Sequence, residues 1–143
     1  MKDIEMAVEL LEKEKLALAI VKEGKVIFSS SDKGIMPLYT AIKEQKNELV
    51  GSSVADRVTG KAAAMLCAYA GIKQLKTKLI SDNAVNVLKE TNILFEYGER
   101  APYIKNRDKT GMCPVETLSL KTENIDELFL GIENFLDSIK KLN

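Results

Sequence analysis

The chain has 143 residues, a length that suits one domain with its own core, so we expect a single domain over 1–143. Basic and acidic residues number 21 each, and no overall charge would attract nucleic acid or an anionic membrane. Histidine is absent, which removes the commonest metal ligand and the usual general base near neutral pH. We expect a cytoplasmic protein without a membrane partner, because there is no membrane-length apolar run, signal segment or disulfide framework.

The first elements expected along the chain are a helix and a β-hairpin. Apolar residues recur at helical spacing near the N-terminus, which predicts a helix over residues 3–13. Two short apolar runs, 16–21 and 26–29, are typical of strands. The segment between them contains Gly24, which can take positive φ, so the two strands should form a hairpin with a tight turn.

Helices and strands then alternate. A second helix is expected with Pro37 in its first turn, followed by a third strand over 48–54 that ends at residues 55–57. The third predicted helix, 59–70, is apolar nearly all round, which indicates burial against a sheet, and Gly71 should end it.

The next three elements define the expected architecture. Residues 73–80 and 93–97 predict the fourth and fifth strands, and residues 82–91 predict a helix between them, capped by Ser81 or Asp82. Repeated strand–helix units imply a mainly parallel sheet with helices on both faces, to which the opening hairpin adds an antiparallel edge. We therefore expect an α/β fold with three α/β/α layers and a mixed sheet of about five strands.

The C-terminal part should hold a long loop and an amphipathic helix. Residues 98–112 predict no regular structure, and a loop of that length in a compact domain is often functional. A capping box of Asn124 and Glu127 should begin the terminal helix. The apolar faces of the first and terminal helices are candidates for a homo-oligomer surface.

Three motifs carry a resemblance to a known family. They are Gly-Ile-Met-Pro-Leu at 34–38, Asp-Arg-Val-Thr-Gly-Lys-Ala-Ala-Ala at 56–64, and the segment 102–116 from Pro-Tyr-Ile to Met-Cys-Pro-Val-Glu. With the order of elements, they make the chain resemble the DUF1893 family, an uncharacterised group with a cytidine deaminase-like fold. The resemblance implies that fold and carries no established activity.

The zinc site of cytidine deaminases cannot be assembled from this sequence. In those enzymes one helix begins with a His or Cys ligand and a Glu, and the next supplies two Cys ligands. Here the corresponding segments, 34–37 and 56–61, contain neither thiols nor histidine, and the whole chain has only two cysteines. We therefore expect no zinc-dependent deaminase activity, no metal and no cofactor.

The segment that replaces the thiols is chemically unusual. Lys61 falls in the first turn of the third helix, where the helix dipole disfavours a cation, so a counterion is expected. One interpretation is an anion site made by Gly60, the helix N–H groups and the Lys61 ammonium at the carboxyl end of a strand. The other is a structural ion pair in which Asp56 neutralises Lys61.

Cys113 is the second candidate centre. Pro114 suits the first position of a short helix, which makes Cys113 its N-cap and lets the Glu116 carboxylate reach back toward it. A thiol at a helix N-terminus has a lowered pKa, so Cys113 is a candidate nucleophile with Glu116 or Asp108 as proton acceptor. Alternatively Cys113 is a buried capping thiol that acts as a small apolar residue.

The leading hypothesis places a small-molecule site between the start of the third helix and the 102–116 loop. The ligand would be a small anionic or nucleotide-like molecule. The ligand-binding residues would be Asp56, Gly60, Lys61 and Arg107. An enzyme with Cys113 as nucleophile and a catalytically inactive interaction module are the alternatives. Acidic residues dilute the basic loop around Arg107, which argues against nucleic acid as the partner.

Overall fold

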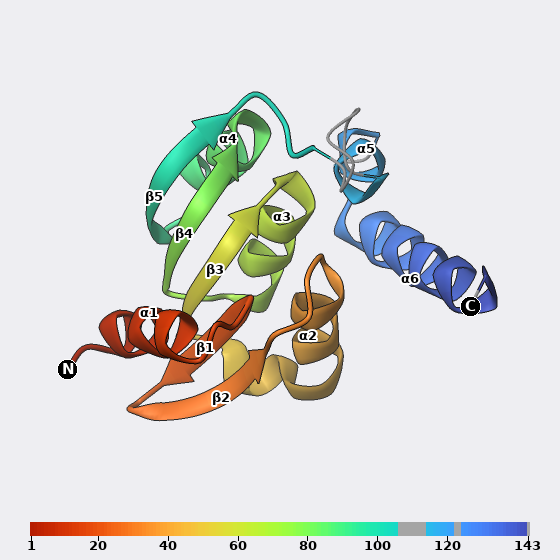
Figure 1. Cartoon of the computed structure of the whole chain (residues 1–143). Coiled ribbons are helices and arrows are strands. Elements are labelled where there is room, and N and C mark those ends of the chain that lie inside the picture. Colours follow the sequence, from red (N-terminus) through yellow and green to blue (C-terminus); the bar gives the residue numbers. More distant parts are fainter. Residues whose placement is uncertain (106–113, 122–123, 143) are drawn as a thin grey trace.

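The computed structural model describes residues 1–105, 114–121 and 124–142, with side chains described as far as Ser138. Its five strands form one mixed sheet in the order β2-β1-β3-β4-β5, which confirms the predicted α/β architecture (Figure 1). β1 is antiparallel to both β2 and β3, whereas β3, β4 and β5 are parallel. The strands are β1 (Leu18–Lys22), β2 (Lys25–Ser30), β3 (Ser53–Thr59), β4 (Gln74–Ser81) and β5 (Leu94–Ala101).

Helices cover both faces of the sheet. Figure 1 shows α1 in front of the strands and α3 and α4 behind them. Two separate apolar clusters follow from this layering: α1 packs on β1 and β3, and the larger core lies between the sheet and the other helices. The helices of the described residues are α1 (Asp3–Lys13), α2 (Met36–Leu49), α3 (Lys61–Ala70), α4 (Asp82–Lys89), α5 (Pro114–Leu120) and α6 (Ile125–Leu142).

The hairpin turn is anchored by the first helix. Glu23 and Gly24 both have positive φ, 52° and 76°, the pattern of the tight turns that match strand twist. The Asp3 carboxylate accepts hydrogen bonds from both of their N–H groups, at 2.8 and 2.9 Å. The predicted hairpin is thereby confirmed, and its turn is fixed to the start of α1.

The third strand lies later in the chain than the sequence indicated. The prediction of 48–54 was wrong because Leu49, which is fully buried, belongs to the last turn of α2. Gly51, with φ of 78°, then turns the chain into β3. As a result Asp56 lies within β3 and not after it. β5 also extends beyond the predicted end, as far as Ala101.

The last two helices pack mainly on α3 and on each other. Asn124 begins α6 as predicted, because its side-chain oxygen accepts hydrogen bonds from the N–H groups of Asp126 and Glu127. A Cβ at Gly131 would lie only 2.9 Å from a methyl carbon of Leu118, so glycine allows α6 to lie close to α5. Among the described residues, no helix is both long and apolar enough to cross a membrane.

Candidate functional site

One carboxylate lies at the start of α3. Gly60 is the N-cap of this helix and has no side chain with which to cap it. The Oε1 atom of Glu116, from α5, accepts a hydrogen bond from the Lys61 N–H at 3.2 Å. Since the first N–H groups of a helix have no partner within the helix, Glu116 supplies the acceptor that Gly60 lacks.

The same carboxylate also contacts the start of α4. The Ser81 hydroxyl oxygen caps α4 by accepting a hydrogen bond from the Ala84 N–H at 3.1 Å. The Ser81 hydroxyl in turn donates to Oε1 of Glu116 at 3.4 Å. One carboxylate therefore connects the starts of two helices, which follow the neighbouring parallel strands β3 and β4. This edge, at the carboxyl ends of the strands, is where open α/β sheets bind ligands.

Gly60 provides the space that Glu116 occupies. A Cβ built on Gly60 would overlap Oε2 of Glu116 and would lie 3.2 Å from a side-chain carbon of Ile104. The backbone of Gly60 is extended, with φ of −91°, so glycine is not required here for its conformational freedom. It is required because the carboxylate approaches the backbone too closely for any side chain.

Burial sets the electrostatics of this cluster. Glu116 is 3% exposed and Lys61 is 7% exposed. Burial raises the pKa of Glu116 above its usual value, while the N–H groups of Lys61 and Ile104, the Ser81 hydroxyl and the Lys61 charge oppose that rise. The ionised form of Glu116 thus depends on these neighbours, and the charge of Lys61 acts on Glu116.

Asp56 forms a second desolvated carboxyl group, within β3. Burial raises the pKa of Asp56 to about 7, although it accepts hydrogen bonds from the N–H groups of Arg57 and Val58, at 2.8 and 3.4 Å, and from the Thr59 hydroxyl. The Thr59 hydroxyl also lies 3.0 Å from that of Thr77 on β4. The end of β3 therefore carries two neighbouring polar clusters, one around Asp56 and one around Glu116.

Comparison with known proteins identifies the family. A family model described as a domain of unknown function (DUF1893), named TM1506, matches residues 6–136. The chain belongs to the DUF1893 family. The crystal structure of the DUF1893 protein TM1506 from Thermotoga maritima is 31% identical in sequence, with a TM-score of 0.84, and the match covers 94% of this chain and 90% of that one.

Two further structures are more distant from this DUF1893 protein. They are structures of RibD from Acinetobacter baumannii, form 1 and form 2, which are 16% and 15% identical, each with a TM-score of 0.49. The matches cover 83% and 90% of this chain but only 36% and 39% of RibD. A comparison with curated protein sequences found no significant match.

The structure of this DUF1893 protein brings together part of the predicted site. Gly60, Lys61 and Glu116 meet at the start of α3, and Asp56 lies four residues before Gly60 on β3. The other predicted site residues lie outside the described residues, so their proposed roles stay predictions. These residues are Arg107, Asp108 and Cys113.

Sequence reasoning missed two contributors to the Glu116 cluster. Ser81 was expected only as the cap of α4, and Ile104 was not singled out. Gly60 was recognised as a place where helix N–H groups are exposed, because a glycine at a helix N-cap leaves the first N–H groups without a side-chain partner. That partner comes from residue 116, which is too distant in sequence for any local pattern to identify.

Proposed function

We propose that this protein binds a small anionic ligand, such as a carboxylate or a nucleotide-like phosphate, where α3 and α4 begin. The observation that carries the proposal is the position of the Glu116 carboxylate, which already lies against the start of α3 with Lys61 as its neighbouring cation. According to this proposal, the Glu116 carboxylate occupies the position that the ligand would take, so Glu116 and the ligand compete for the same N–H groups.

The chemistry of the site supports an anion more than a neutral molecule. The N-terminus of a helix presents N–H donors and a partial positive charge, and the Lys61 ammonium adds a full charge. The surroundings of Lys61 are largely closed to water, which strengthens such interactions. A phosphate that displaced Glu116 would take over the hydrogen bond of the Lys61 N–H and the donor of Ser81.

Competition between Glu116 and the ligand predicts that loss of the Glu116 charge strengthens ligand binding. Binding elsewhere on the surface would not depend on Glu116. In Glu116→Gln the side chain keeps its shape but loses its charge, so an incoming anion meets a weaker competitor and should bind more tightly. In Lys61→Met the ligand loses its cation and binding should fall. Lys33→Met, in an exposed loop, serves as the matched control for removal of a lysine charge.

The measurement is the rise in melting temperature caused by inorganic phosphate, ribose 5-phosphate or adenosine monophosphate. A tenfold gain in affinity at saturating ligand adds about 1.4 kcal/mol to stability, a shift of a few degrees for a domain of this size. Circular dichroism and ligand-free melting curves establish that each variant is folded. The proposal is wrong if none of the three probes stabilises either the wild type or Glu116→Gln. It is also wrong if the probes stabilise Lys61→Met as much as the wild type.

A further inference from the structure

A groove lies between α2 and α6, and both charged and apolar side chains line it. Its volume is about 480 Å³, within the range of small-molecule pockets. It lies apart from the Glu116 cluster and shares no residue with it. The groove is lined by Met36, Tyr39, Thr40, Lys43 and Glu44 of α2 and by Glu133, Leu136 and Asp137 of α6.

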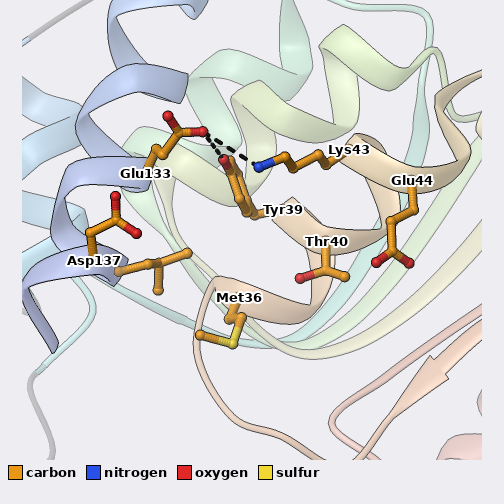
Figure 2. A pocket seen from close by; sticks show the side chains of 8 residues that line it. Met36, Tyr39, Thr40, Lys43, Glu44, Glu133 and Asp137 are labelled. Carbon is orange, nitrogen blue, oxygen red and sulfur yellow. Dashed lines mark hydrogen bonds and ion pairs between the residues drawn. The ribbon is translucent and has the colours of Figure 1, made fainter. Parts of the chain in front are cut away.

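Glu133 organises one end of this groove. The Tyr39 hydroxyl donates a hydrogen bond to Oε2 of Glu133 at 2.7 Å, and the Lys43 ammonium lies 3.6 Å from the same oxygen (Figure 2). The Tyr39 ring packs against Phe129 of α6, with ring centres 4.8 Å apart, so the hydroxyl is held in place. Both neighbours lower the pKa of Glu133, which keeps its carboxylate ionised.

The charge of the groove is unbalanced. Three carboxylates line it, those of Glu44, Glu133 and Asp137, against the single ammonium of Lys43, a formal charge of −2. Asp137 follows Glu133 by one helical turn, and its charge acts on the Tyr39 hydroxyl. Within the described part of the chain, the Asp137 carboxylate has no hydrogen bond or ion pair. A cation entering the groove would therefore meet carboxylates from both α2 and α6.

Part of the groove lining is apolar. Met36 of α2, Leu136 of α6 and the Tyr39 side chain belong to this part. An apolar lining together with carboxylates suits a ligand that has an alkyl portion and one positive end. Inorganic cations lack the first property, and carboxylates and phosphates lack the second.

We propose that this groove binds a small organic cation, a protonated primary amine carried on a short alkyl chain. The ammonium lies between the carboxylates of Glu133 and Asp137, where it competes with Lys43 for Glu133. The alkyl chain covers Met36 and Leu136. The arguments are charge complementarity and the apolar part of the lining, so this inference stands independently of the anion site at α3.

The test uses n-butylamine as the probe, with n-butanol as a neutral molecule of the same shape. Binding is followed by NMR through the methyl group of Met36 and the backbone amides of residues 133–137. Butylammonium should cause saturable shifts at these positions with a millimolar dissociation constant, and n-butanol should bind several-fold more weakly. Added salt should weaken butylammonium binding, because the groove is open to solvent.

Two variants locate the charge that matters. Asp137→Asn should weaken butylammonium binding about two- to fivefold, the range for partly exposed ion pairs. Asp126→Asn removes an exposed carboxylate from the first turn of the same helix and should leave binding unchanged. Equal binding of n-butanol and butylammonium, an unaffected Asp137→Asn variant, or shifts scattered over the surface would each overturn the proposal.

Discussion

Asp56 should make this protein less stable as the pH rises from 5 to 8. Its pKa in the folded protein is raised from 3.8 to about 7, mainly by burial. Between these two values the folded state holds a proton that the unfolded state has released, so stability falls as pH increases. Above about pH 7 both states are ionised and the loss levels off.

The size of this effect follows from the pKa shift. A shift from 3.8 to about 7 is about 3 units, and at 1.36 kcal/mol per unit the ionised side chain costs the folded state about 4 kcal/mol. Part of this cost is already present at pH 5, where the unfolded chain is ionised. Between pH 5 and pH 8 the wild type should therefore lose about 2–3 kcal/mol through Asp56 alone.

The assay is urea unfolding followed by circular dichroism at pH 5, 6, 7 and 8, on the wild type and Asp56→Asn. The amide can still accept hydrogen bonds from the N–H groups of Arg57 and Val58, but it carries no charge. Its stability should therefore vary less with pH, and the difference from the wild type should grow by about 2–3 kcal/mol from pH 5 to pH 8. The chain has no histidine, so no imidazole titrates in this range.

The contribution of Asp56 can be separated from that of other carboxyl groups. Glu116 also has a raised pKa and contributes with the same sign, but it is present in both proteins and cancels in the difference. Asp32→Asn, in an exposed loop, should follow the wild type at every pH. If the difference between wild type and Asp56→Asn is the same at pH 5 and pH 8, the reasoning about Asp56 is refuted.

Two further predictions concern the Glu116 cluster and the thiols. Gly60→Ala should lower the free energy of unfolding by about 1–3 kcal/mol, because its Cβ overlaps the Glu116 carboxylate. In a double-mutant cycle, the same substitution should cost much less in a Glu116→Ala background, where that carboxylate is missing. Additive losses would contradict the contact. Cys67 is 1% exposed and burial raises its pKa, so iodoacetamide should modify it only after unfolding. If Cys113 is an activated nucleophile, mass spectrometry should show it alkylated in the folded protein with a pKa below about 8.5, and a value at or above 8.5 would exclude activation.

The sequence predicted most of the fold because its elements carry strong local signals. The structure contains the helix α1 that the apolar spacing predicted, and it buries most of the apolar surface of α3. Gly71 ends α3, as expected. The third strand was misplaced because Leu49 and Val50 are apolar in either a strand or the end of a helix, and periodicity cannot separate the two over so short a run. Tertiary packing of Leu49 decided in favour of the helix.

The contacts around Lys61 were harder to predict than its position in the chain. A lysine in the first turn of a helix indicated a need for a counterion, and Asp56 was the acid considered for that role. In the structure the charge of Lys61 acts on Glu116, which reaches the start of α3 through the packing of α5 on α3. Raised pKa values at Asp56 and Glu116 depend on burial, which no local sequence pattern reveals.

The contact between Glu116 and the start of α3 also has a consequence for the order in which the chain is made. Lys61 and Glu116 are 55 residues apart, and Ser81 and Glu116 are 35 apart. A ribosome adds roughly 5–20 residues per second, so the segments that form β3, α3, β4 and α4 are synthesised some seconds before Glu116. The carboxylate that joins the starts of α3 and α4 is therefore made after both of these helices, and the contact at the start of α3 can form only once α5 has been added.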